Sequence, residues 1–237
     1  MYIIAEAGIN HNGDLDTALK LCAAAKAAGA ACVKFQMYTM DNLFLPDRLA
    51  ERYKALMPVL ARCELDGSSY MKIRDYCREI KMDWAATPED MAGVEWLLEN
   101  HAAFIKVGSR QALNFNYLDQ LGTPTIKVLM SMGLSSERER NAALCLVPSA
   151  RLLLCVSKYP AEAKEYLGGC GLLADKSHAG VSDHTVGLGV PVAAAGAKMN
   201  YLEKHFTLDR AQIGPDHAFS LDPATFKIMV DAIRDIT

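Results

Sequence analysis

The chain has 237 residues, of which 51% are hydrophobic, so it can bury enough apolar surface to fold without crosslinks. Its formal net charge of −3 argues against a general affinity for nucleic acid, and any cluster of basic residues needs a local explanation. The first residues do not resemble a signal peptide, and no stretch approaches the roughly 18 apolar residues of a membrane span. We therefore expect a cytoplasmic protein that contacts neither nucleic acid nor membrane.

Short β-rich runs alternate with longer amphipathic segments along the whole chain. The expected strands are residues 2–5, 32–36, 83–86, 103–107, 125–130, 151–156, 179–182 and 201–204. The expected helices are residues 14–28, 69–80, 89–99, 114–121, 135–143, 162–173, 187–198 and 223–235. Strands that are each followed by a helix predict an α/β protein with a closed parallel sheet, the TIM (β/α)₈ barrel, as a single domain over residues 1–237. An open doubly wound sheet is the alternative.

The segment 42–68 is long for a connection between two elements. Such long connections in compact domains often carry function. We expect this one to contain a short helix and to overhang one mouth of the barrel.

The last expected helix has a clear start signal and one apolar face. Asp222 can cap it, and Pro223 suits its first turn. Apolar residues then recur at offsets of three, four and seven, at positions 226, 229, 230 and 233. This spacing predicts one buried stripe.

Seven cysteines form an odd set without a C-x-x-C pair. Several lie in apolar runs, such as Cys32 before Val33 and Cys155 after Leu154. We therefore expect buried thiols in a reducing compartment, and neither disulfides nor a zinc site.

Polar residues lie in or directly after nearly every expected strand. In chain order they are Glu6, Lys34, Gln36, Thr87, Lys106, Ser109, Ser131, Ser157, Tyr159, Ser182, Asp183, His184, Glu203 and His205. The carboxyl ends of the strands of a TIM barrel form one mouth, where active sites lie. Each residue alone is more typical of a solvated rim or a satisfied core position, but together they indicate a site.

The residue types that converge suit a phosphorylated substrate and a cation. Lys34 and Lys106 can neutralise a phosphate, and serine hydroxyls can donate to its oxygens. His184 and His205 follow the last two strands, so both imidazoles could bind one metal ion with positions left open for water and substrate. A pair of hydrogen-bonded rim histidines is the alternative.

Five segments together resemble one known family. Residues 4–13 read I-A-E-A-G-I-N-H-N-G, and V-K-F-Q at 33–36, S-D-H-T at 182–185, E-K-H-F-T at 203–207 and G-P-D at 214–216 follow in order. This ordered set resembles the N-acetylneuraminate (sialic acid) synthase family from residue 3 to the C-terminus. Each short piece alone is a weak signal.

The resemblance implies a transferase on a TIM barrel. Members of that family condense phosphoenolpyruvate with an N-acetylated hexosamine aldehyde, typically N-acetylmannosamine, to a nonulosonic (sialic-type) acid and release phosphate. Relatives make legionaminic, pseudaminic and spore-coat sugars. The family uses a divalent metal, commonly Mn²⁺, with Mg²⁺ or Co²⁺ as alternatives.

The resemblance implies catalytic, substrate-binding and metal-binding roles for the individual residues that match the motifs of the family. The expected catalytic carboxylates are Glu6, Glu203 and Asp216. The expected substrate-binding residues are Lys34, Gln36, Thr87, Lys106, Ser109, Gln111, Ser157, Tyr159 and Ser182, with Lys34, Lys106, Ser109, Ser182 and Tyr159 at the phosphoenolpyruvate. The expected metal ligands are His184 and His205.

The sequence departs from the family pattern mainly among the residues expected to bind the sugar aldehyde, which is the acceptor of the reaction. Gln111 stands where the family usually has an acidic residue, and Arg110 before it could supply a positive group, although an exposed rim arginine is the favoured interpretation. Residues 154–160 replace a usual H-C-T-x-x-Y-P, and residues 131–134 replace S-T-G-M.

The family's C-terminal antifreeze-like (SAF) domain has no counterpart in this sequence. In the family that domain reaches the sugar site of a partner subunit. The domain is either absent, removed from this sequence or supplied by a separate SAF-domain partner. A homodimer is expected only because symmetric homodimers are the commonest oligomers. Two alternatives for function remain: the same donor chemistry with a different aldehyde, and a non-catalytic barrel that acts as a binding subunit.

Overall fold

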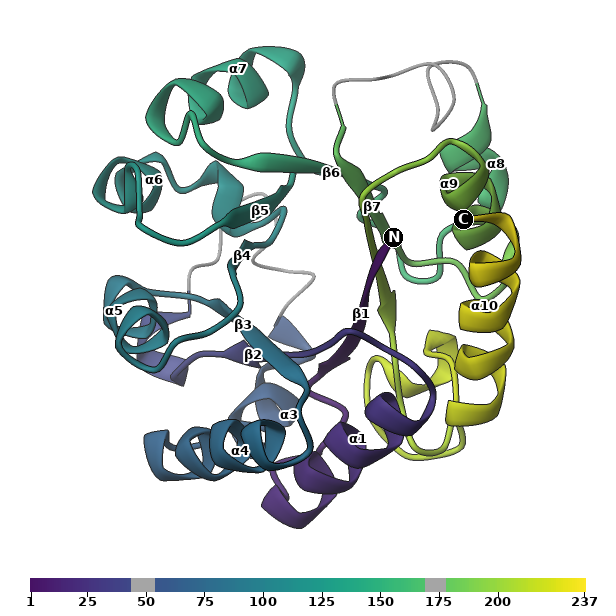
Figure 1. Cartoon of the computed structure of the whole chain (residues 1–237). Coiled ribbons are helices and arrows are strands. Elements are labelled where there is room, and N and C mark those ends of the chain that lie inside the picture. The colour runs from purple at the N-terminus through teal and green to yellow at the C-terminus, as the bar shows by residue number, and fades with distance from the viewer. Residues whose placement is uncertain (44–53, 169–177) are drawn as a thin grey trace.

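The computed structural model describes residues 1–43, 54–168 and 178–237. Eight parallel strands pair in chain order and close into one barrel, because β1 pairs with both β2 and β8. The strands are β1 (Tyr2–Gly8), β2 (Cys32–Met37), β3 (Asp83–Pro88), β4 (Ile105–Val107), β5 (Val128–Ser131), β6 (Arg151–Cys155), β7 (Gly180–Asp183) and β8 (Tyr201–His205). The expected TIM barrel is confirmed, and closure excludes the open sheet (Figure 1).

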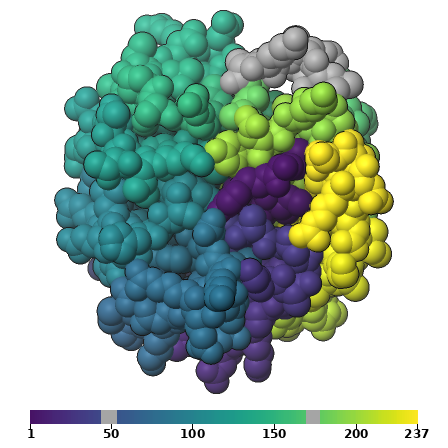
Figure 2. Space-filling view, viewed as in Figure 1, coloured from purple at the N-terminus to yellow at the C-terminus, as the bar shows by residue number. Residues whose placement is uncertain are grey.

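Helices form a layer around the barrel and cover its outer face (Figures 1 and 2). The α-helices are α1 (Leu15–Ala27), α3 (Met57–Arg62), α4 (Gly67–Glu79), α5 (Met91–Glu99), α6 (Phe115–Leu121), α7 (Glu137–Leu146), α8 (Ala163–Leu167), α9 (Gly189–Gly196) and α10 (Pro223–Ile236). Short 3₁₀ helices are η1 (Met40–Asn42), η3 (Gln111–Leu113) and η4 (His217–Phe219). No helix within the described ranges has both the length and the apolar character that a bilayer crossing requires.

The expected helix 162–173 is shorter than the sequence pattern predicts. α8 ends at Leu167, and Gly168 follows it in an extended conformation. A glycine readily leaves the helical conformation, so the local sequence allows the helix to stop here. Residues 169–173 of the expected helix lie outside the described residues.

The helix α10 forms as its sequence predicts. Asp222 accepts a hydrogen bond from the backbone N–H of Thr225, and Pro223 occupies the first turn. Four apolar side chains of the expected stripe are buried: Phe226, Met229, Val230 and Ile233. The helix therefore packs one face against the barrel and leaves the other in solvent.

The expected helix within segment 42–68 is α3, and it contributes to one end of the barrel. Leu56 and Leu60 line the cavity described below, as does Leu43. The expectation of an overhanging connection is confirmed for these residues. Residues 44–53 of the segment lie outside the described residues.

The cysteines differ in exposure, which corrects the expectation that all are buried. Cys22, Cys32, Cys63 and Cys77 are buried free thiols, as predicted. Cys145 is exposed on α7, and Cys155 is partly exposed because it lines the cavity. Cys170 lies outside the described residues.

Candidate active site

Two layers of inward-facing side chains fill the barrel. The lower layer is apolar and consists of Ile4, Cys32, Ala85, Phe104, Leu129 and Leu153. Side chains of a strand alternate between its two faces, so the residue two positions later faces the interior again. Those later residues are Glu6, Lys34, Thr87, Lys106, Ser131 and Cys155, and all of them line the cavity. The apolar layer thus closes the barrel below a polar floor.

A cavity of about 400 Å³ lies above this floor, at the carboxyl ends of the strands. All of the residues with an expected catalytic, substrate-binding or metal-binding role line it: Glu6, Lys34, Gln36, Thr87, Lys106, Ser109, Gln111, Ser157, Tyr159, Ser182, His184, Glu203, His205 and Asp216. The convergence expected from the strand ends is therefore confirmed for these residues. An apolar wall that includes Ile9, Tyr38 and Phe219 completes the cavity.

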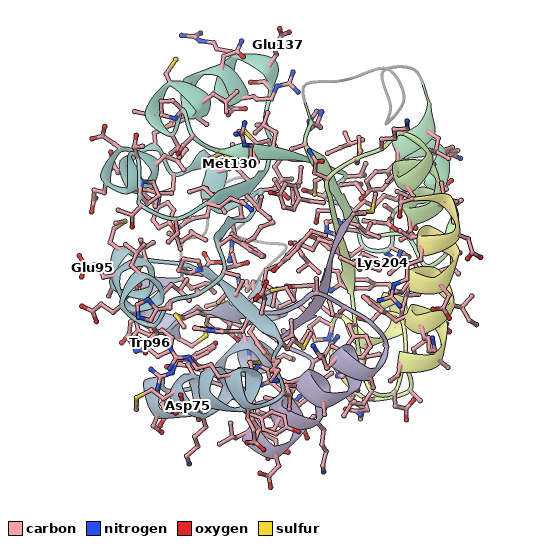
Figure 3. The ribbon with its side chains drawn as sticks, in the orientation of Figure 1. Asp75, Glu95, Trp96, Met130, Glu137 and Lys204 are labelled. Atoms are coloured by element: carbon pink, nitrogen blue, oxygen red, sulfur yellow. The ribbon has the colours of Figure 1, made fainter. Side chains whose placement is uncertain are left out.

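Asp183 does not belong to the cavity, contrary to the expectation from its place at a strand end. It lies between Ser182 and His184, so strand alternation turns it toward the outer face of the barrel. Its Oδ2 lies 2.6 Å from the Nζ atom of Lys204, and both side chains are fully buried. Lys204 also donates to backbone carbonyls of the loop after β7. Figure 3 shows Lys204 on the side of the barrel that faces the helices.

Lys34 is held in an anionic environment. Its Nζ atom lies 2.5 Å from Glu6 Oε2 and 3.7 Å from Glu203 Oε2, and it donates to Thr87 Oγ1 at 3.0 Å. Burial acts to lower the pKa of Lys34, but the charges of Glu203 and Glu6 raise it above its usual value. Burial likewise acts to raise the pKa of Glu203, and the charges of Lys34 and Lys106 outweigh this effect and hold it at about 2. Lys34 and Glu203 are therefore both charged.

Lys106 has neutral partners only. Its ammonium donates to Ser131 Oγ at 2.9 Å and to the carbonyl oxygen of Val107 at 3.1 Å. In the part of the chain that the structure describes, no carboxylate forms an ion pair with it. Burial lowers the pKa of Lys106, although Glu203 acts in the opposite direction. A buried ammonium whose direct partners are all neutral is a favourable place for an anion.

The two expected metal ligands lie side by side. The ring centroids of His184 and His205 are 5.5 Å apart, and the ring of Tyr159 lies 4.2 Å from that of His184. His184 donates from Nδ1 to the carbonyl oxygen of Val156 at 2.6 Å, and its Nε2 lies 3.4 Å from Ser182 Oγ. Burial acts to lower the pKa of His184, but Cys155 and the Val156 carbonyl raise it above its usual value, so a metal ion at Nε2 would displace a proton. His205 Nδ1 is buried and has no hydrogen-bond partner among the described residues, and Asp216 Oδ2 lies 3.8 Å away.

This arrangement fits a divalent cation with an incomplete protein shell. Burial lowers the pKa of His205 well below its usual value, so its imidazole is neutral, as a metal ligand must be. The alternative of a hydrogen-bonded rim pair does not account for the unpartnered nitrogen of His205. Across the described ranges no set of three His, Cys, Asp or Glu side chains forms a metal cluster, so water and substrate oxygens would complete the shell.

Two further carboxyl groups of the cavity have raised pKa values. Burial raises the pKa of Glu6 although Lys34 opposes it, and burial together with the Glu6 charge raises the pKa of Asp216 to about 7. Ser220 Oγ donates to the backbone carbonyl of Asp216, and Asn10 Nδ2 donates to that Ser220 oxygen at 3.0 Å. Asn10 of the first motif therefore holds the loop that carries Asp216.

The wall at β3 and β4 contains a buried ion pair. Arg110 contacts Glu89 Oε1, and their side chains are 13% and 4% exposed. Arg110 lines the cavity, so the expectation of an exposed rim arginine is wrong: the buried carboxylate draws the guanidinium inward. Gln111 donates from Nε2 to the backbone carbonyl of Glu89 at 2.5 Å.

Comparison with known proteins identifies the family. The profile of the NeuB family matches residues 21–237. The N,N'-diacetyllegionaminic acid synthase of Legionella pneumophila is 33% identical over 99% of this chain and 71% of its own length. The chain belongs to the NeuB family.

Other relatives agree with this assignment. The N-acetylneuraminate-9-phosphate synthase of Homo sapiens is 30% identical over 98% of this chain and 69% of its own. The crystal structure of an N-acetylneuraminic acid synthetase from Leptospira borgpetersenii superposes with a TM-score of 0.85 at 27% identity, over 99% of this chain and 83% of that one. NeuB-family relatives of this chain are thus sialic and legionaminic acid synthases.

Three features of this NeuB-family site were not anticipated from the sequence. Cys155 and Glu89 both continue an inward-facing series, after Leu153 and Thr87 respectively, so strand alternation could have indicated them. Tyr166 on α8 could not be found this way. Its hydroxyl donates to the carbonyl oxygen of Ser182 and accepts from the backbone N–H groups of Val156 and His184.

Proposed function

We propose that this NeuB-family protein condenses phosphoenolpyruvate with an N-acetylated sugar aldehyde to a nonulosonic acid and releases phosphate. The observation that carries the proposal is the buried ammonium of Lys106, which has only neutral partners and faces the same cavity as Lys34 and a pair of imidazoles. The same cavity therefore contains ammonium groups that can bind an anionic substrate and imidazoles that can bind a metal ion. The names of the three relatives given above, which are synthases of legionaminic and neuraminic acids or of the neuraminate 9-phosphate, support this reaction type.

The donor would bind over the polar floor. Phosphoenolpyruvate carries a phosphate and a carboxylate, and Lys106, whose direct hydrogen-bond partners are neutral, would supply positive charge to one of them. The hydroxyls of Ser109, Ser182 and Tyr159 line the same cavity and would donate to the remaining oxygens. Lys34 shares its charge with Glu6 and Glu203, so it would contribute less to binding than Lys106.

A divalent metal, most simply Mn²⁺ with Mg²⁺ or Co²⁺ as alternatives, would be held by His184 and His205. Such an ion would polarise the carbonyl of the aldehyde as a Lewis acid. The unpartnered, buried Nδ1 of His205 supports this assignment.

The reaction joins two carbons and breaks one carbon–oxygen bond. C3 of phosphoenolpyruvate attacks the aldehyde carbon, whose oxygen takes up a proton and becomes a hydroxyl, and positive charge develops at C2. Water adds to C2 and gives a proton to a carboxylate, for which Glu6, a buried side chain of the polar floor, is the candidate. The bond between C2 and the phosphate oxygen then breaks while the C2 hydroxyl passes its proton to the departing phosphate, which leaves a 2-keto acid and inorganic phosphate. Lys106 stabilises the charge on the departing phosphate.

Asp216 is suited to the proton at the aldehyde oxygen. Its pKa of about 7 lets it carry or release a proton at neutral pH. It lies beside His205, on the side of the cavity where the aldehyde would bind.

The proposal is tested by phosphate release from phosphoenolpyruvate with a panel of aldoses that includes N-acetylmannosamine. Lys106→Met should raise KM for phosphoenolpyruvate roughly 10- to 100-fold, because a charge-assisted contact is lost. Lys72→Met, on the exposed surface of α4, is the control and should behave as wild type. Absence of release with every aldose, or an unchanged KM in Lys106→Met, would contradict the proposal. Release with other aldehydes only would indicate a different acceptor.

A further inference from the structure

Glu89 has one carboxylate oxygen that the protein leaves without a partner. Oε1 contacts the guanidinium of Arg110, whereas Oε2 is buried and accepts no hydrogen bond from any described residue. The side chain is only 4% exposed and lines the cavity. A buried carboxylate oxygen without a donor is unfavourable, and a ligand that donates an O–H or N–H to it gains correspondingly.

The neighbouring amide does not satisfy this oxygen. Gln111 uses Nε2 to donate to the backbone carbonyl of Glu89, and its Oε1 accepts from Asn114 at 3.4 Å. Its hydrogen bonds are therefore directed to the protein. At this wall, within the described ranges, the Glu89 carboxylate therefore has the oxygen that a ligand can satisfy, and the guanidinium of Arg110 lies beside it.

The charge around Glu89 disfavours an anionic ligand. A second hollow adjoins the cavity at Glu89, and its other lining residues include Asp41 and Asp90. Among the described residues that line this hollow there is no lysine or arginine. Arg110 is already neutralised by its ion pair, so a phosphate group would meet more negative than positive charge here.

The barrel order places this wall opposite the imidazoles. β3 and β4 lie across the barrel from β7 and β8, which carry His184 and His205 near their ends. Under the proposed function the aldehyde lies at the imidazoles, and the far end of the acceptor chain reaches toward β3 and β4.

We propose that Glu89 and Arg110 form a specificity-determining pair that binds an uncharged hydroxyl at the far end of the acceptor, so that the acceptor is a non-phosphorylated aldose. The hydroxyl donates to Glu89 Oε2, and its oxygen can accept from the Arg110 guanidinium. This inference rests on the proposed function and specifies the substrate class of the same site.

The test compares acceptors and variants under the same phosphate-release assay. The acceptors are N-acetylmannosamine, its 6-phosphate and its single deoxy analogues. Wild type should use the unphosphorylated sugar with kcat/KM at least about tenfold higher than its 6-phosphate, and one deoxy analogue should lose a similar factor. Glu89→Gln keeps the size of the side chain and removes its charge, which releases Arg110.

Glu89→Gln should raise KM for the unphosphorylated sugar about tenfold, leave KM for phosphoenolpyruvate unchanged and reduce the preference against the 6-phosphate. Glu95→Gln, on the outward face of the helix that follows β3, is the matched control and should leave all values unchanged (Figure 3). Should Glu89→Gln fail to fold, the wild-type comparison of acceptors still decides the question.

Two kinds of failure are distinguishable. A wild-type preference for the 6-phosphate, or equal use of all deoxy analogues, would overturn this inference while phosphate release upholds the proposed function. The same holds if Glu89→Gln folds and keeps the wild-type KM for the sugar. Absence of release with every aldose would overturn the proposed function, and this inference with it.

Discussion

Lys34 and Lys106 are buried lysines of the same cavity, but their surroundings shift their pKa values in opposite directions. Carboxylates beside Lys34 stabilise its charged form. Lys106 has only a hydroxyl and a backbone carbonyl as partners, so desolvation dominates. The two lysines should therefore respond differently to pH.

Binding of phosphoenolpyruvate should weaken as the pH rises, and this loss should begin before the pH reaches the usual lysine pKa of about 10.4. Lys106 binds the anion when protonated, and its protonated fraction falls as the pH rises through its lowered pKa. Lys34, whose pKa is raised, stays protonated over this range. A profile of KM for phosphoenolpyruvate against pH should show an alkaline rise in wild type and none in Lys106→Met. A wild-type KM that stays constant up to the usual lysine pKa would contradict this assignment.

The alternation of side chains between the two faces of a strand explains which cavity residues could be predicted from the sequence. Residues such as Glu6 and Lys34 stand two positions after apolar interior residues, so an alternating pattern together with a barrel hypothesis places them at the mouth. The same rule excludes Asp183, which was expected at the mouth from its position at a strand end alone. The inward turn of Arg110 was not predictable, because it depends on Glu89, a residue distant in sequence.

The ends of β7 and β8 are held together by the buried pair of Asp183 and Lys204. Each residue stands between two cavity residues, so the pair fixes the backbone from which Ser182, His184, Glu203 and His205 project. Removal of one partner would leave an uncompensated buried charge, which is more costly than the pair is favourable.

Lys204→Met should lower the free energy of unfolding by about 3–5 kcal/mol, measured by urea denaturation. The double variant Lys204→Met/Asp183→Leu should recover most of this loss, since no unpaired charge remains. The control is Lys227→Met, which breaks an exposed ion pair with Asp231 on α10 and should change stability by less than about 1 kcal/mol. Equal losses in the two single variants would show that burial of the first pair is unimportant.

Strand and helix positions followed from local patterns more reliably than their ends did. The strand expected at residues 125–130 begins at Val128, where pairing with Ile105 of β4 starts. Local residue preference predicts where a strand lies. The residues at which the strand begins and ends depend on its pairing with the adjacent strand, which the local sequence does not show. The 3₁₀ helix η3, which carries Gln111, likewise gave no periodic signal.

Closure of the barrel brings the first and last motifs of the chain together. Glu6 pairs in register with His205, 199 positions later in the sequence. No local property of either segment indicates this contact. It followed from the hypothesis that all eight strands form one closed sheet, which in turn depended on counting the alternating segments correctly.

Ligands that bind this one cavity should stabilise the entire barrel. Phosphoenolpyruvate at a hundred times its dissociation constant adds about 2.7 kcal/mol, which corresponds to a rise of about 5–10 °C in Tm for a domain of this size. Mn²⁺ should raise Tm in wild type and not in His205→Ala, as followed by differential scanning calorimetry. An equal response to Mn²⁺ in both proteins would remove His205 from the metal site, and no response to phosphoenolpyruvate would favour a non-catalytic barrel.

The hydroxyl of Tyr166 has a consequence for how the cavity can move. It holds one hydrogen to donate and two lone pairs, and its three backbone partners use all of them. These partners belong to Val156, Ser182 and His184, so the carboxyl ends of β6 and β7 are hydrogen-bonded to the same side chain. Any displacement of α8 must therefore shift the donor side and the imidazole side of the cavity as a coupled unit.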